Sequence, residues 1–177
     1  MYPLKISLVL KHIHWQHYLK YALMAAILYS IATIFYLSRA SFTQAWWLYM
    51  GNFGFLIVII LSLFAFNRQR RQNASTVSMM TGGLITVITG IIIAVIAGFI
   101  LVLFFVPGFL HAGPAEKLLS NAPANTIKDK TEGLSFMLFA NAIVGNFSVG
   151  LAACIIFPFT LKRDQTSEKV PQKQAEL

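Results

Sequence analysis

Charged side chains are scarce in this chain of 177 residues. Only 11% of the residues are charged, whereas soluble domains usually carry about 25%. Acidic residues are the scarcest, with six Asp and Glu against 14 Lys and Arg. The hydrophobic share is 57% and the mean hydropathy is +0.68. This composition excludes an ordinary water-soluble globule and indicates an integral membrane protein.

Cysteine is almost absent as well. The single thiol, Cys154, lies inside the last apolar run. One cysteine excludes an intramolecular disulfide and a thiolate metal cluster. No basic, wetted sequence surrounds it, as an activated thiol requires, so we expect a buried apolar role.

No ionisable residue lies in the middle of any apolar run. Such residues mark proton relays, ion paths and charged-substrate sites, so their absence argues against a pump, a proton-coupled transporter or a voltage sensor. The chain also lacks a nucleophile elbow, a metal-binding helix motif and paired carboxylates. We therefore expect no catalytic residues, no cofactor and no enzyme activity.

The one histidine cluster is His12-x-His14-x-x-His17. Three imidazoles could hold a metal such as zinc if they converged, but no carboxylate lies nearby to orient them. An interfacial segment rich in histidine explains the pattern better, so we predict no metal site.

Four long apolar runs fill most of the sequence. Each is long enough to cross a hydrocarbon core about 30 Å thick, which takes roughly 20 helical residues. The runs are Lys20–Leu37, Ala45–Phe66, Met79–Val106 and Leu134–Leu161. They predict an all-α fold, an integral membrane four-helix bundle whose transmembrane domain covers residues 20–161.

Three polar segments flank or interrupt these runs. Residues 1–19 mix apolar and basic side chains, which predicts a cytoplasmic amphipathic segment that either lies in the inner interface or extends the first span. The outer loop, residues 107–133, is rich in Pro and Gly and is either a contact surface or a plain connector. Residues 162–177 are polar and predict a disordered cytoplasmic tail.

The basic residues are distributed unequally between the two sides of this layout. Ten lie in the N-terminal segment, the turn after the second span and the tail, against four in the other connections. The positive-inside rule therefore predicts that both termini are cytoplasmic, in a bacterial inner membrane. Positions at the span ends suit anionic lipid headgroups and do not suggest a nucleic-acid surface.

Small residues recur along one face of the third span. They are spaced by four, an arrangement that lets another backbone approach closely, either within the bundle or from a partner. These residues are Gly82, Thr86, Gly90, Ala94 and Gly98. The first span carries a similar face of Ala22, Ala25, Tyr29, Ala32 and Tyr36.

The fourth span carries an uncharged polar seam. Spacings of four, three and four place Asn141, Gly145, Ser148 and Ala152 on one helical face. Asn146 falls about 140° away from that face at 100° per residue. With Asn52 of the second span, the seam offers either interhelical hydrogen bonds or ligands for a neutral polar group.

Two segments of the sequence resemble those of a known family. A basic turn, NRQRRQNAS, follows the second span, and the third span reads TGGLITVITGIIIAVIAG. With four spans and a long outer loop, the chain resembles the bacterial inner-membrane family called domain of unknown function 4199. The resemblance covers nearly the whole chain and implies a four-span fold, but no reaction and no catalytic residues.

Two functions follow as hypotheses. The preferred one is a non-enzymatic structural or accessory subunit, which packs against another membrane protein or itself through the third-span ladder and the outer loop. The alternative is a small-solute or lipid transporter or channel that uses Asn52, Asn141 and Ser148. Pro158 is expected to kink the fourth span near its inner end.

Overall fold

The structure is a computed structural model that describes residues 15–39, 44–69, 75–105 and 136–167. The predictions for residues 1–14, the outer loop and the last ten residues lie outside these ranges. The described helices are α2 (Trp15–Arg39), α3 (Trp46–Gln69), α4 (Thr76–Phe105), the π-helix η3 (Asn141–Gly145) and α6 (Asn146–Ser167).

Four helices are long and apolar enough to cross a membrane, as the sequence predicts. The fourth of these runs from Phe136 to Leu161 and contains η3 and most of α6. All four helices extend past the predicted apolar runs, α2 and α6 by the most. α2 begins at Trp15, five residues before Lys20, and α6 continues six residues beyond Leu161.

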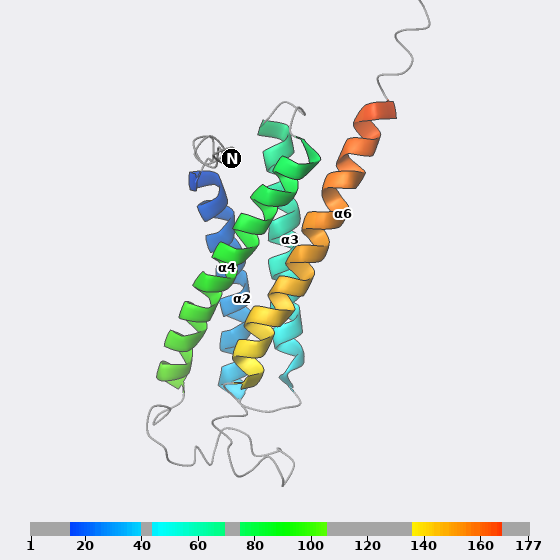
Figure 1. Cartoon of the computed structure of the whole chain (residues 1–177). Coiled ribbons are helices and arrows are strands. Elements are labelled where there is room, and N and C mark those ends of the chain that lie inside the picture. Colours follow the sequence, from blue (N-terminus) through cyan, green and yellow to red (C-terminus); the bar gives the residue numbers. More distant parts are fainter. Residues whose placement is uncertain (1–14, 40–43, 70–74, 106–135, 168–177) are drawn as a thin grey trace, which may run out of the picture.

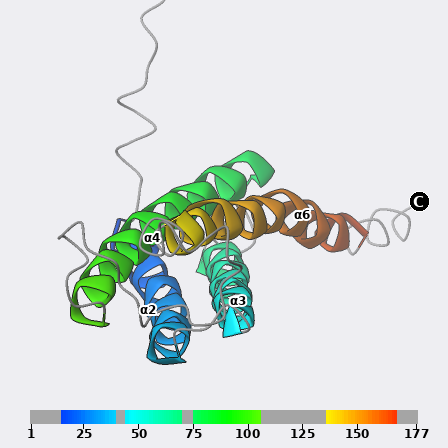
Figure 2. The same cartoon turned by 90° about the horizontal axis from the view of Figure 1, so that it is seen from below.

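The helices pack side by side in two layers. α2 packs against α3 and α4, and α6 packs against the same two helices. Seen along the bundle, α4 and α6 cross over the pair formed by α2 and α3 (Figure 2). Successive helices alternate in direction, so the start of α2, the end of α3 and the end of α6 share one end of the bundle (Figure 1).

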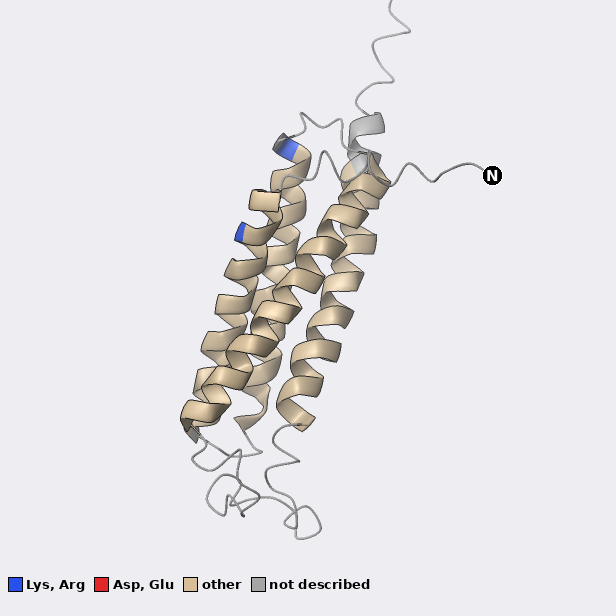
Figure 3. Ribbon diagram, turned by 60° about the vertical axis from the view of Figure 1, so that its left-hand side comes forward, with Lys and Arg blue, Asp and Glu red and all other residues tan. Residues whose placement is uncertain are grey.

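Charge is confined to that end among the side chains that the structure describes. Lys20, near the start of α2, and Arg68, near the end of α3, are exposed and are the two blue segments of Figure 3. No Asp or Glu lies in the four membrane-length helices. The described side chains along the rest of the ribbon are therefore uncharged.

The start of α4 follows from its sequence. Ser75 precedes the helix and its hydroxyl accepts a hydrogen bond from the backbone N–H of Ser78 at 3.1 Å. Its carbonyl accepts one from the N–H of Met79 at 3.0 Å. A serine in this position satisfies amide groups that the first turn of a helix leaves unpaired.

The predicted face of α2 forms part of the core. All five of its members, Ala22, Ala25, Tyr29, Ala32 and Tyr36, are buried. Small alanines alternate with large tyrosines along this face, so neighbouring helices approach at the alanines and the rings fill the space between. Phe55 and Ile59 of α3 and Val87 of α4 complete the central cluster.

The glycine ladder of α4 is used mainly inside the bundle. A Cβ added at Gly90 would lie 3.0 Å from the Phe55 ring and 3.5 Å from the carbonyl oxygen of Ala22. One added at Gly82 would lie 2.9 Å from the Tyr18 hydroxyl. Gly98 differs, because a Cβ there would meet nothing within 4 Å. The small residues thus bring α4 onto α2 and α3 over most, but not all, of the ladder.

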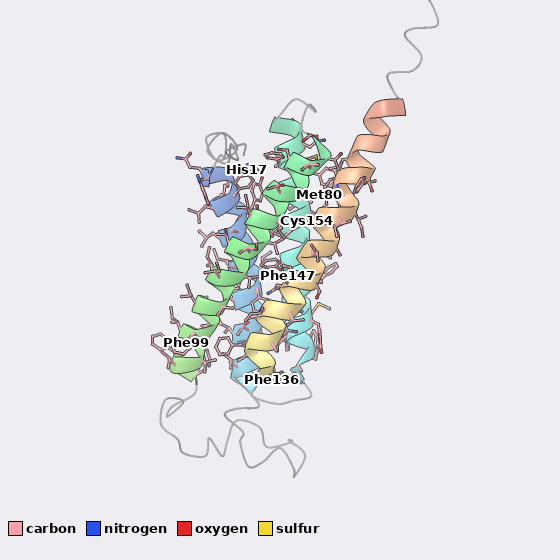
Figure 4. All side chains as sticks on the ribbon, viewed as in Figure 1. His17, Met80, Phe99, Phe136, Phe147 and Cys154 are labelled. Atoms are coloured by element: carbon pink, nitrogen blue, oxygen red, sulfur yellow. The ribbon has the colours of Figure 1, made fainter. Side chains whose placement is uncertain are left out.

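α6 crosses α4 through a second set of small residues. A Cβ at Gly150 would lie 2.7 Å from a methyl group of Val87, and one at Gly83 would lie 2.7 Å from the Cys154 sulfur. Cys154 is buried at this crossing, which agrees with its expected apolar role (Figure 4). Pro158 lies inside the continuous helix, four residues further on.

Candidate functional site: an uncharged polar cluster at a π-helix

The fourth membrane-length helix contains one turn of π-helix, Asn141–Gly145. In an α-helix the Ala142 carbonyl would accept a bond from the backbone N–H of Asn146. Here that N–H bonds to the carbonyl of Ile143, and the side-chain Nδ2 of Asn146 donates to the Ala142 carbonyl at 3.0 Å. Asn146 therefore supports the π-turn with its own side chain. Such turns are rare and occur frequently at functional sites.

The π-turn changes which residues face the bundle. An extra residue in one turn rotates everything after it by about one residue's step, roughly 100°. Ser148 and Ala152 are accordingly exposed, while Asn146, Gly150 and Ala153 are buried. The structure therefore does not bring Ser148 to the predicted seam, and it places Asn146 where the regular spacing had put Gly145.

A hydrogen bond joins this turn to α2. The Tyr29 hydroxyl donates to Oδ1 of Asn141 at 3.0 Å. Tyr29 is 1% exposed, and its ring lies directly on α3, because a Cβ added at Gly51 would be 2.9 Å from the ring. Glycine at position 51 thus makes room for the ring that carries this hydroxyl group.

Asn52 brings α3 into the same site. Its side chain is 6% exposed, and Nδ2 lies 2.6 Å from the position a Cβ would take at Gly145. The carboxamide is therefore aimed at the backbone of the π-turn, at a point where glycine leaves space for it. We call Tyr29, Asn52, Asn141 and Asn146 the polar cluster.

Two oxygens of the polar cluster are unsatisfied. Oδ1 of Asn52 and Oδ1 of Asn146 are buried and have no hydrogen-bond partner among the described residues. Asn146 is fully buried. A buried polar group without a partner costs about 1–3 kcal/mol, so native structures keep few of them without a reason. Both groups are hydrogen-bond acceptors.

The cluster lies off-centre along the bundle. Asn52 is six residues from the start of α3, which corresponds to about 9 Å along the helix axis. Asn141 is five residues from the start of its membrane-length helix at Phe136. Both helices start at the end opposite to Lys20 and Arg68, where Phe136 is labelled in Figure 4. The site is therefore closer to the end opposite to Lys20 and Arg68.

The other predicted site residues occupy separate places. Gly82, Thr86, Gly90, Ala94 and Gly98 are all buried along α4, and the Thr86 hydroxyl donates to the carbonyl of Gly82 in its own helix at 3.0 Å. Of the three histidines, His12 and His14 lie outside the described ranges. His17 stands at the start of α2, with its ring centroid 4.8 Å from that of Tyr21 (Figure 4). Within the described ranges, no group of three or more potential ligands could hold a metal ion.

The predicted polar seam contains neither Asn146, which the sequence offers as a possible polar ligand on another face, nor Tyr29. Asn146 was placed on another face because the spacing was measured on an ideal α-helix. Tyr29 was assigned to a packing face only, although a buried tyrosine usually needs a partner for its hydroxyl. That need is the signal that could have linked it to a polar side chain on another span.

Comparison with known proteins gives no match to a family model, to a curated protein or to a solved structure. The function is therefore argued from the polar cluster and its surroundings.

Proposed function

We propose that this chain is a non-enzymatic, multi-pass membrane protein that handles a small solute or a lipid through the polar cluster. The observation that carries the proposal is the pair of buried, unsatisfied asparagine oxygens beside a π-turn. Polar groups inside a membrane are costly, and those that face a bundle interior commonly mark a functional site. Groups that served only to join helices would have their acceptors paired with donors of the neighbouring helix.

Placement in a membrane is supported by the exterior of the bundle. Large apolar side chains are exposed along all four membrane-length helices, among them Ile27, Ile57, Ile92 and Ile156. Trp46 is exposed at the start of α3 and stacks on Trp47 with ring centroids 4.1 Å apart. Indole rings favour the headgroup level of a bilayer.

The orientation proposed is cytoplasmic for both termini, in a bacterial inner membrane. Lys20 and Arg68 at one end of the bundle support this direction. The sequence supports it as well, because ten basic residues lie on the predicted cytoplasmic side and four on the other. Anionic headgroups of the inner leaflet are the expected partners of that end. The polar cluster then lies in the outer half of the membrane.

Flux measurements test the proposed function. The wild-type protein in proteoliposomes should accelerate the entrance of glycerol or urea, and Asn141→Leu should abolish that acceleration. Ser148→Leu is the matched control, because Ser148 lies on the same helix but is exposed on another face. Equal flux through wild type and Asn141→Leu contradicts the proposal.

The features of α4 favour a second function. In this function the chain is an accessory subunit that packs against another membrane protein or itself. α4 is the most apolar of the four helices and the least covered, with 22% of its most apolar window buried. Gly98 continues the ladder, yet no described side chain and no other described helix lies within 4 Å of its Cβ position. Another helix could approach there.

A substitution at Gly98 distinguishes the two proposed functions. For the accessory subunit, Gly98→Leu should release a co-purifying membrane partner or dissociate a homo-oligomer on a native gel, while leaving the fold intact. For the solute or lipid function, Gly98→Leu should leave flux unchanged. Unchanged migration of Gly98→Leu would count against the accessory role.

A further inference from the structure

Two tyrosine hydroxyls of α2 reach the fourth membrane-length helix, and they meet acceptors of different strength. The Tyr29 hydroxyl donates to Oδ1 of Asn141 at 3.0 Å, whereas the Tyr36 hydroxyl donates to the sulfur of Met137 at 3.6 Å. A carboxamide oxygen is a full acceptor, but a thioether sulfur is a weak one. Tyr36 is fully buried, and its hydroxyl has no other partner among the described residues. The second contact therefore leaves a buried donor poorly satisfied.

We propose that Met137 is a site of oxidation by peroxides, and that its sulfoxide oxygen becomes the acceptor for the Tyr36 hydroxyl. This modification goes beyond the solute or lipid function and does not depend on it. A lone pair of the thioether sulfur attacks a peroxide oxygen, so that an S–O bond forms and the O–O bond breaks. The released hydroxide takes the proton of the transferred oxygen and leaves as water. The sulfur is oxidised because it gives up an electron pair, and the peroxide is reduced because it accepts that pair.

The distance in this contact leaves room for the added oxygen. The hydroxyl oxygen of Tyr36 and the sulfur of Met137 are 3.6 Å apart. A hydrogen bond between two oxygens is shorter, about 2.7–2.8 Å. An oxygen that is bonded to the sulfur and angled off the line between these two atoms therefore lies within hydrogen-bond distance of the hydroxyl while both residues keep their positions. The hydroxyl then has a strong acceptor in place of a weak one.

The position of Met137 allows a water-borne oxidant to reach it. The residue directly follows Phe136, which is 77% exposed at the start of the fourth membrane-length helix. Met137 itself is half-buried, at the end of the bundle opposite to Lys20 and Arg68, where Phe136 is labelled in Figure 4. Met79, by contrast, is fully buried in the core. Oxidation should therefore proceed at Met137 well before Met79.

The packing around Met137 decides what the sulfoxide does. Met137 packs against a buried cluster that includes Tyr36 of α2 and Leu48 of α3. A sulfoxide is polar and normally disrupts such a cluster. The Tyr36 hydroxyl removes this cost, because it supplies the donor that the sulfoxide oxygen needs. One turn further along the chain, the Tyr29 bond to Asn141 joins the same two helices. The sulfoxide therefore reinforces the junction that borders the polar cluster.

Oxidation followed by thermal unfolding tests the proposal. The full-length protein in detergent micelles is treated with hydrogen peroxide, and peptide mapping by mass spectrometry measures the sulfoxide at each methionine. Met137 should be oxidised at least severalfold faster than Met79. Met137→Leu is the matched control, because its response reports the other methionines alone. Oxidation should lower the unfolding temperature of wild type by no more than that of Met137→Leu. It should lower that of Tyr36→Phe by several degrees more, because the sulfoxide then has no donor.

The S=O stretching band reports the hydrogen bond directly. Isotopically labelled peroxide marks this band, and subtraction of the spectrum of the matching protein that carries Met137→Leu isolates the contribution of Met137. The band should lie at lower frequency in wild type than in Tyr36→Phe, because a hydrogen bond to the oxygen weakens the S=O bond. A purely structural role of Tyr36 would leave this frequency unchanged.

Four results overturn the proposal. They are no oxidation at Met137, a larger loss of stability on oxidation in wild type than in Met137→Leu, equal effects of oxidation in wild type and Tyr36→Phe, and equal band frequencies in those two proteins. The first two results require only wild type and Met137→Leu, so they decide the question even if Tyr36→Phe does not fold. None of these measurements uses solute flux, so a failure of the proposed function is distinguished from a failure of this inference.

Discussion

The two ends of this bundle are built by different means. Toward the end that carries Lys20 and Arg68, helices meet through glycine and cysteine contacts, such as Gly82 with Tyr18 and Gly83 with Cys154. Toward the other end, around the π-turn, they meet through asparagine and tyrosine, and two acceptors of the polar cluster lack partners. One further buried oxygen without a partner, Oδ1 of Asn67, lies near the end of α3. The comparison shows close packing of small residues between helices in one region and hydrogen bonding between helices in the other. The polar half costs stability, and a cost of this kind is expected where a protein binds something.

The largest effect should come from filling the glycine-packed region. Gly90→Leu would drive a branched side chain into the Phe55 ring and toward the Ala22 carbonyl, which lie 3.0 and 3.5 Å from its Cβ. Overpacking of this kind costs about 3 kcal/mol, enough to prevent folding of a marginal bundle. Size-exclusion chromatography in mild detergent should show aggregated protein. Gly98→Leu, at an open position of the same ladder, should not aggregate, and similar aggregation of both variants would refute the distinction.

A smaller loss is expected where α4 and α6 cross. Gly150→Ala places a methyl group 2.7 Å from Val87, a stiff β-branched side chain, and should destabilise by about 2 kcal/mol. Thermal unfolding measures the loss. Adding Val87→Ala should recover part of it, because the two residues are in contact and their effects are coupled. Simple additivity of the two substitutions would contradict the described contact.

Gly98→Ala should act in the opposite direction. No described side chain and no neighbouring described helix lies within 4 Å of the added methyl group, so the gain in helix propensity should dominate. That gain is about 0.5–1 kcal/mol in a helix interior. A higher unfolding temperature than wild type is the expected result, and a lower one would mean that position 98 is closely packed.

The smallest change should come from Tyr29→Phe. The ring remains in place against Gly51, and only the hydrogen bond to Asn141 is lost. Interhelical hydrogen bonds in membrane proteins contribute about 0.6 kcal/mol on average. A loss several times larger would indicate that the Tyr29 hydroxyl organises the whole polar half.

The sequence was sufficient to predict the helices and most of their packing faces. Long apolar runs have one structural solution in a bilayer, and the buried face of α2 follows from regular helical spacing at Ala22, Ala25 and Tyr29. The polar site was predicted only in part. Asn52 and Asn141 lie in it, but Ser148 is exposed and Asn146 takes the buried position.

The reason for that difference is local. The contacts made by this π-turn come from other helices: Asn52 lies close to Gly145, and Tyr29 donates to Asn141. No pattern of residues within the fourth span predicts such a turn. Once one extra residue enters the turn, every later position on the helix is displaced by one. Regular spacing therefore predicts the packing of α2 and α4 and fails only beyond residue 141.

The most direct test of the account compares the unfolding temperatures of Asn52→Leu and Asn141→Leu, purified without added ligand. The two substitutions are similar in shape but should have opposite signs. Asn141→Leu removes the acceptor of a buried tyrosine hydroxyl and should lower the unfolding temperature. Asn52→Leu removes a buried oxygen that has no partner among the described residues and should raise it. A fall for both variants would mean that Asn52 only joins helices, and would contradict the assignment of the polar cluster as a binding site.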